Sequence, residues 1–139
     1  MKTFLFWFAS LTWGCIMSTF GLFAAVGMLI TAHAPKRFGH AIYFEKRRSG
    51  GGCVNLGPVF IVSKGVGHNI KAHEYGHGWQ NIVYGPGHVI ISLCSFTRYW
   101  YREWMRRYRP NVYLRPYDAI WFEGQATEWG LKYSPYKIN

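Results

Sequence analysis

The sequence predicts an α+β protein in which one N-terminal transmembrane helix precedes a small domain with a β-hairpin and about three helices. Three observations support this prediction: a charge-free apolar run at the N-terminus, two β-rich segments around residue 50, and three later segments of helical character. Half of the 139 residues are apolar and 19% are aromatic, so the composition is that of a folded chain and not of a disordered one. We therefore expect a membrane anchor over residues 1–34 and one domain over residues 35–139.

The N-terminal segment has the length and composition of a helix that crosses a membrane once. No Asp, Glu, Lys or Arg lies between Lys2 and Lys36. As a helix, the apolar run from Phe4 to Ile30 would be about 40 Å long, against about 30 Å for a bilayer core. A cleaved signal peptide is the alternative, because residues 32–34 read Ala-His-Ala, but the run is longer than a usual signal core.

Small residues recur along one face of this predicted helix, at Ser10, Gly14, Ser18, Gly21 and Ala25. Such residues allow a close approach of another element, which could belong to a second copy in a homo-oligomer or to the same chain. Ordinary use of small residues in a membrane helix gives the same pattern.

The basic residues predict an orientation and a partner. The formal net charge is +10, from 16 Lys and Arg against 6 Asp and Glu. One lysine precedes the apolar run, whereas Lys36, Arg37 and residues 46–48 follow it closely. The positive-inside bias then places the C-terminal domain on the cytoplasmic side of a bacterial inner membrane. There it would contact the lipid bilayer and its anionic surface, a partner that we favour over nucleic acid.

The domain reads as a hairpin followed by helices. Residues 39–46 and 53–64 are β-rich, and the turn-forming sequence RRSGGG joins them. A helix is expected over residues 69–84, and Gly-Pro-Gly at residues 85–87 ends it. Residues 88–108 begin with an apolar half that is too short to span and continue with aromatics and arginines, which is typical of a helix that dips into the membrane interface. Asp118 is expected to cap a last helix that runs to about Leu131.

The sequence KAHEYGHGWQN, residues 71–81, contains His73-Glu74-x-x-His77. On a helix the two histidines are about 40° apart, so both imidazoles can reach one Zn²⁺. Glu74 projects beside such a metal, where it can accept a proton from a zinc-bound water. The alternative is a helix with two surface histidines and an unrelated glutamate. A cysteine zinc site is not expected, because the three cysteines are widely spaced and form no C-x-x-C pair.

A zinc site of this kind needs a third protein ligand downstream of the two histidines. The candidates are His88, Glu103, Asp118, Glu123 and Glu128. Glu103 lies among arginines, which is typical of a surface ion pair. Glu123 and Glu128 point about 140° apart on a helix, so only one of them can face the zinc. Glu123 shares its face with Thr127 and Gly130, whose small size would let the histidine helix pack closely.

Taken together, HEYGH and the later EGQAT resemble the zincin metallopeptidases of the gluzincin type. The resemblance implies a zinc-dependent hydrolase that cuts peptide or protein substrates. It implies His73, His77 and Glu123 as the zinc ligands and Glu74 as the catalytic base. The stretches LGPVFI, HEYGHGWQN, SFTRYWYR and YDAIWFEGQAT are also similar to a group of small, poorly characterised bacterial membrane proteins with the same motif order. This similarity runs from about residue 35 to residue 131 and implies a minimal zincin-like domain.

The resemblance leaves three roles open. Many gluzincins have an aspartate where this chain has Thr127, so the partner of a zinc-bound histidine could be Asn81, a backbone carbonyl or Thr127 itself. The group that stabilises the oxyanion could be Tyr117, Tyr133 or Arg115. In larger zincins an edge strand aligns the substrate by β-pairing, and residues 59–63 are the expected equivalent.

Three other functions share some of these sequence features. Site-2-type intramembrane proteases share the histidine motif, but their second element is an aspartate in an L-D-G-like sequence, and here Asp118 lies in PYDAI. The sequence RYWYREWMRRYR could bind nucleic acid through arginines and aromatics. A non-catalytic membrane protein with a structural metal, or with none, is the remaining alternative.

Overall fold

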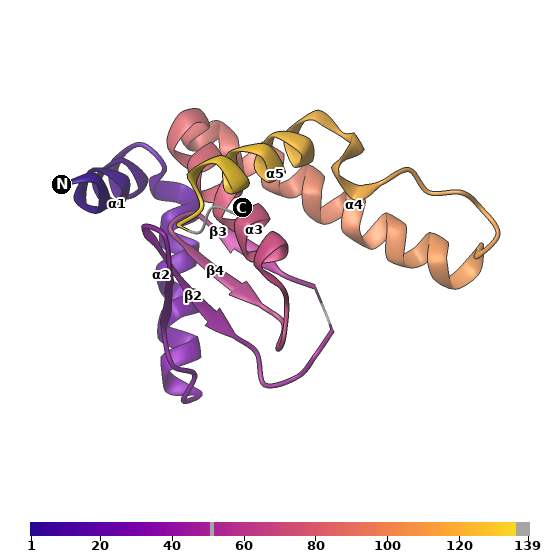
Figure 1. Ribbon diagram of the computed structural model, residues 1–139, viewed down its shortest axis with the longest axis horizontal. Coiled ribbons are helices and arrows are strands. Elements are labelled where there is room, and N and C mark those ends of the chain that lie inside the picture. Colours follow the sequence, from indigo (N-terminus) through magenta and orange to yellow (C-terminus); the bar gives the residue numbers. More distant parts are fainter. Residues whose placement is uncertain (51, 136–139) are drawn as a thin grey trace.

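The computed structural model describes residues 1–50 and 52–135 and has an α+β architecture (Figure 1). Its helices are α1 (Lys2–Thr12), α2 (Cys15–Ile30), α3 (His68–Tyr84), α4 (His88–Tyr108) and α5 (Trp121–Tyr133), with short 3-10 turns η1 (Gly85–Gly87) and η2 (Tyr117–Ala119). Its strands are β1 (Lys36–Phe38), β2 (Ala41–Glu45), β3 (Val54–Leu56) and β4 (Val59–Val62). They form one sheet in the order β1-β2-β4-β3, and α2 and α3 cover its opposite faces.

The sheet is mixed, so the predicted hairpin between the two β-rich segments is wrong. Each segment instead turns back within itself: Gly39 and His40 join β1 to β2, and Gly57 and Pro58 join β3 to β4. The strands that then meet, β2 and β4, run parallel. The predicted edge strand over residues 59–63 is also wrong, because β4 has a partner on both sides.

Alternation along the strands gives the sheet two buried faces. Phe60 and Val62 of β4 belong to the core under α3, and the Tyr43 ring of β2 stacks on Phe60 with 5.3 Å between centroids. Val59 and Phe44, which alternate with them, are equally buried and point to the face that α2 covers. A sheet covered on both faces holds α3 in a fixed position.

The predicted single N-terminal helix is wrong, because the helix is interrupted at Trp13 and Gly14. The two helices on either side, α1 and α2, are bent by 104° relative to each other. Asn81 of α3 packs against the interruption: a Cβ at Gly14 would lie 2.3 Å from the Asn81 amide nitrogen. That amide also donates a hydrogen bond of 3.3 Å to the Gly14 carbonyl. Within the described part of the chain, no one helix has the length and apolarity to cross a bilayer, and α1 and α2 meet that criterion only as a bent pair.

The small residues of this segment contact the rest of the same chain, which confirms one of the predicted uses. Ser10 and Ser18 are fully buried, and the Ser18 hydroxyl donates a hydrogen bond of 2.7 Å to the Ser10 carbonyl. A Cβ at Gly21 would lie 2.2 Å from the Leu56 carbonyl of β3. The N-terminal helices therefore pack onto the sheet and α3 through their small residues.

The later helices lie where the sequence predicts them, except that α5 begins at a different place. The histidine helix is confirmed as α3, and residues 88–108 form one continuous helix, α4. The predicted cap by Asp118 is wrong: Asp118 is exposed in η2, and α5 begins only after the extended residue Ile120, without a side-chain cap. The extended backbone at Ile120 separates the Asp118 carboxylate from the first turn of α5.

Candidate metal centre

Helices α3 and α5 approach each other backbone to backbone. A Cβ at Gly76 would lie 1.8 Å from the Ala126 carbonyl oxygen, and a Cβ at Gly130 would lie 1.8 Å from the Ala72 carbonyl oxygen. Any side chain at either glycine would force the helices apart. This confirms that the small neighbours of Glu123 let the histidine helix pack closely, and it places the two predicted motifs next to each other.

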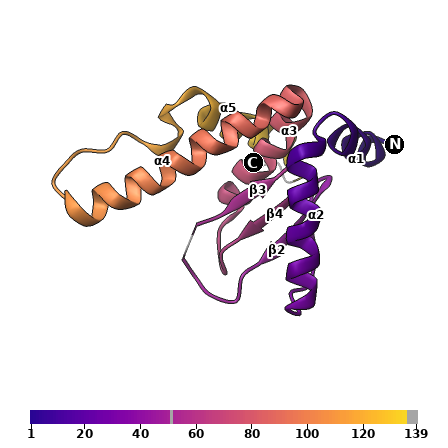
Figure 2. The same ribbon diagram turned by 180° about the vertical axis from the view of Figure 1, so that it is seen from behind.

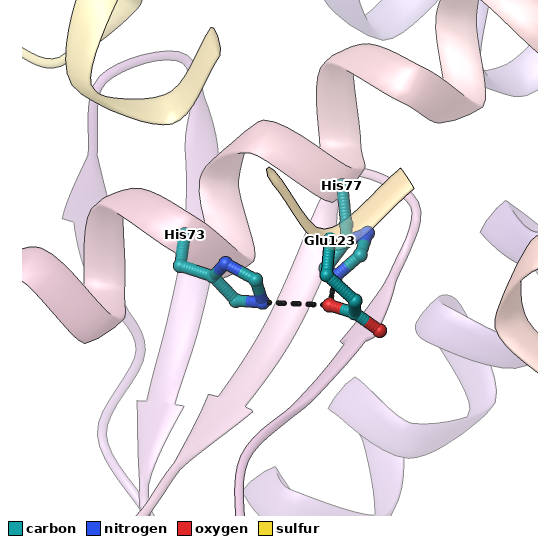
Figure 3. A group of neighbouring side chains, drawn as sticks. All are labelled: His73, His77 and Glu123. Carbon is teal, nitrogen blue, oxygen red and sulfur yellow. Dashed lines mark ion pairs between the residues drawn. The ribbon is translucent and has the colours of Figure 1, made fainter. Parts of the chain in front are cut away.

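The donor atoms of His73, His77 and Glu123 lie within 4.8 Å of one another (Figure 3). The Glu123 Oε2 atom is 3.2 Å from Nε2 of His73 and 3.3 Å from Nε2 of His77. The histidines come from successive turns of α3, and Glu123 comes from the first turn of α5. Glu123 is fully buried, whereas His73 keeps partial access to solvent.

Hydrogen bonds at the far side of each imidazole determine which nitrogen carries the proton. Nδ1 of His73 is 2.9 Å from the Thr127 hydroxyl, which itself donates to the Glu123 backbone carbonyl. Nδ1 of His77 is 2.7 Å from Oε1 of Gln80, whose amide nitrogen donates to the Phe122 carbonyl. Both oxygens therefore accept from Nδ1–H, and each Nε2 keeps its lone pair for a metal.

This arrangement of lone pairs fits a bound cation. Two Nε2 lone pairs and a carboxylate oxygen converge, and the Glu123 Oε2 atom is buried without a hydrogen-bond partner. Three acceptors at this separation repel one another unless a positive charge lies between them. Two imidazoles and one carboxylate are a donor set that Zn²⁺ prefers, and three protein ligands leave a fourth position for water.

Helix α4 supports the carboxylate from its other side. The Ser95 hydroxyl donates a short hydrogen bond to Glu123 Oε1. Burial raises the pKa of the Glu123 carboxyl, and the Ser95 hydroxyl that donates to it acts in the opposite direction. A carboxyl group has to be ionised to bind a metal, and the hydrogen bond from Ser95 favours that form.

Glu74, the expected base, lies on α3 between the two histidines and is 7% exposed. The pKa of its carboxyl is raised to about 7: burial is the largest cause, the charge of Glu123 adds to it, and His73 and Lys46 oppose it. The backbone at Glu74 is held in place by β3, because the side-chain amide of Asn55 donates a hydrogen bond of 2.8 Å to the Glu74 carbonyl. The carboxyl therefore lies within electrostatic range of the metal ligands on a rigid support.

Tyr117 of η2 lies against His73, with 6.2 Å between ring centroids. Burial raises the pKa of its hydroxyl, and the carboxylates of Glu123 and Glu74 add to the effect. The other two candidates for the oxyanion lie elsewhere: the Tyr133 ring packs against Trp79 in a tilted arrangement, and Arg115 is exposed. Of these three groups, Tyr117 is the one that the fold brings to the site.

The other candidate ligands do not join the group. Glu128 is exposed, as expected, and Glu103 forms the predicted surface ion pair with Arg106. His88 is buried, with its ring centroid 6.1 Å from that of His77, and neither of its nitrogens has a hydrogen-bond partner. Burial, together with the nearby His77, lowers the pKa of His88 to about 3, so it packs as a neutral ring.

Two residues of the site were missed at the level of sequence. Gln80 lies three positions after His77, one helical turn away, and this spacing could have identified it as the partner of that imidazole. Ser95 comes from a different helix, and no local pattern points to it. Asn81, which was considered for a role beside a histidine, contacts Gly14 and Ser18 instead.

Comparisons of the chain with protein-family models, with curated proteins and with solved structures find no match. The resemblance to gluzincins therefore depends on the motifs alone. What the centre can do has to be inferred from its own donor atoms and from the residues around them.

Proposed function

We propose that the protein is a zinc-dependent peptidase. The observation that carries this proposal is the convergence of two imidazole Nε2 atoms and the Glu123 carboxylate at the contact between α3 and α5. When bound, zinc lowers the pKa of a coordinated water to near neutral and polarises the peptide carbonyl. His73, His77 and Glu123 hold the metal, and the fourth position is left to water and substrate.

The chain's own residues then handle the proton. Glu74 accepts a proton from the attacking water through its carboxylate, and it returns that proton to the nitrogen of the leaving amine as the C–N bond breaks. The position of Glu74 beside His73 on a buried helix supports this role. Thr127 and Gln80 hold the two imidazoles in the tautomer that leaves Nε2 free for the metal.

Two features weigh against the alternatives. A structural zinc site usually has four protein ligands, whereas the group found among the described residues has three. Of the arginines that could bind nucleic acid, Arg98 and Arg102 instead donate to the carbonyls of residues 115–117 and lie over the Tyr117 ring, which leaves only those at the end of α4 exposed. A peptide or protein substrate and a cytoplasmic position remain predictions.

The proposal is tested on the full chain purified in detergent. We expect stoichiometric zinc by elemental analysis and hydrolysis of fluorescent casein that a zinc chelator abolishes and added Zn²⁺ restores. Glu74→Gln should keep its zinc and lose about 10²- to 10⁴-fold in hydrolysis, because general base catalysis contributes about that factor. Glu128→Gln, at an exposed position of α5, is the matched control and should change neither quantity. A protein without zinc, or a fully active Glu74→Gln variant, would refute the mechanism.

A further inference from the structure

The outer sides of α2 and α4 are apolar and exposed. Helix α2 packs on the sheet through Met17, Ser18 and Gly21, and its opposite side is open. Helix α4 turns Ser95 toward the metal centre, and its opposite side is open as well. We define the α2–α4 face by the exposed residues Phe20, Phe23 and Ile30 of α2 and Leu93, Phe96 and Trp100 of α4.

Both helices lie on the same side of the molecule. In the view of Figure 2, α2 passes in front of the strands and α4 passes in front of α5. From the opposite side, in Figure 1, the strands and α5 lie in front of them. The two helices also contact each other. Their exposed sides therefore belong to one surface.

This surface is not that of an ordinary soluble monomer. From Cys15 to Ile30, α2 carries no charged residue, and the exposed positions of α4 carry none between Ile90 and Trp104. Phe23 is 74% exposed and Phe96 is 61% exposed. A soluble monomer rarely leaves so extended an apolar surface open, so the face calls for a partner.

We infer that the α2–α4 face lies in the surface of a lipid bilayer, with both helices in the membrane plane and neither of them crossing it. Helix α2 has 16 residues and is about 24 Å long, short of a bilayer core of about 30 Å. Its inner side carries the sheet, so lipid can surround only its outer side. Amphipathic attachment of this kind buries apolar side chains to the level of the headgroups and upper acyl chains.

The basic residues around the α2–α4 face favour lipid as its partner. At the C-terminal end of α2, a shallow pocket is lined by four basic residues and one acidic one, Lys36, Lys46, Arg47, Lys64 and Glu45, so its net charge is positive although Glu45 pairs with Lys36. At the C-terminal end of α4, Arg107 and Arg109 are exposed. Basic residues at both ends of an uncharged apolar face match the anionic headgroups that surround an acyl-chain surface. The aromatic rings of Trp100 and Trp104 are typical of the same interface.

A second copy of the chain fits the face less well. Close contacts between membrane helices need small residues. The small residues of this segment, Ser10, Gly14, Ser18 and Gly21, are already in contact with the chain's own residues. The side chains that remain outside are large and apolar, as at a boundary with lipid. This inference goes beyond the proposed peptidase function and does not depend on a bound metal.

The test is flotation of the full chain, synthesised in a cell-free system in the presence of preformed vesicles of phosphatidylcholine and phosphatidylglycerol. The wild-type chain should float with the vesicles. Phe23→Glu/Phe96→Glu, which adds a charge to each helix of the face, should lower the bound fraction at least about tenfold. Val112→Glu/Leu131→Glu adds the same charges at exposed positions outside the face and should float like the wild type.

Tags at both ends separate lying on the membrane from crossing it. A protease added outside the sealed vesicles should remove both tags, because in-plane helices leave both termini on one side. Protection of one tag would show a span and overturn the in-plane arrangement. Unchanged flotation of Phe23→Glu/Phe96→Glu would show that the α2–α4 face does not contact the bilayer. Lipid-independent dimers that this double variant abolishes would identify a second copy as the true occupant.

Discussion

Between α3 and α5, ionisable side chains are buried, whereas on the outer sides of α2 and α4, large apolar side chains are exposed. Ionisable side chains are usually exposed and large apolar side chains are usually buried, so both regions depart from the usual distribution. Buried ionisable groups are costly unless something neutralises them, and the converging lone pairs at His73, His77 and Glu123 indicate a cation. Exposed apolar groups are costly in water, and they indicate a partner that is not water. The first region therefore indicates a bound cation, and the second region indicates an apolar partner.

The largest effect is expected from removing the buried carboxylate. Glu123→Ala should lose most of its zinc and all hydrolytic activity, because two neutral imidazoles hold Zn²⁺ far more weakly than three ligands do. Glu128→Ala, five residues further along the same helix and exposed, should keep its zinc. Elemental analysis of both folded variants decides between them. Stoichiometric zinc in Glu123→Ala beside a zinc-free Glu128→Ala would reverse the assignment of the ligand.

A smaller effect is expected where the two regions meet. Gly14→Leu forces a side chain against Asn81 of α3, and overpacking of this kind costs about 1–3 kcal/mol of unfolding free energy. Gly27→Leu is the control, because a Cβ at Gly27 meets no atom within 4 Å. Denaturant unfolding in detergent measures both variants. Equal stability of the two would mean that the apolar helices and the metal centre fold independently.

The smallest effect concerns the tautomer of one ligand. Thr127→Val removes the oxygen that accepts from Nδ1–H of His73, and loss of such a partner typically lowers metal affinity about 10- to 100-fold. Thr127→Ser restores the hydroxyl and should restore the affinity. Competition with a zinc-binding dye gives both dissociation constants. If Thr127→Val binds zinc as tightly as the wild type, another group orients this imidazole.

The sequence predicted the proximity of His73, His77 and Glu123 better than it predicted the fold around them. His73, Glu74 and His77 follow from spacing within one helix, and the choice of Glu123 over Glu128 followed from helical geometry and from the motif that resembles gluzincins. Gln80 was within reach of the same reasoning. Ser95 was not, because its contact with Glu123 depends on the path of α4 after η1, which no local pattern specifies.

The incorrect fold predictions share a cause: each depended on a partner far away in the sequence. Residues 4–30 have the composition of a straight helix, and the contacts of Gly14 with Asn81 and of Gly21 with Leu56 come from residues much later in the sequence. The two β-rich segments read as a hairpin, but the parallel pairing of β2 with β4 depends on where two tight turns place them. Local composition predicted the type of each element and could not predict which elements would pair.

The bond between Asn81 and Gly14 has a consequence for the order of synthesis. The two residues are 67 positions apart, so at about 5–20 residues per second the ribosome adds Asn81 about 3–13 s after Gly14. During that interval residues 4–30 are a nascent, uncharged apolar segment, which is what the cell's targeting machinery recognises. The hydrogen bond from Asn81 to Gly14 can form only after the histidine helix has been synthesised. Under the inference that the α2–α4 face lies on a bilayer, the apolar segment would therefore be available to lipid before this contact holds its bend.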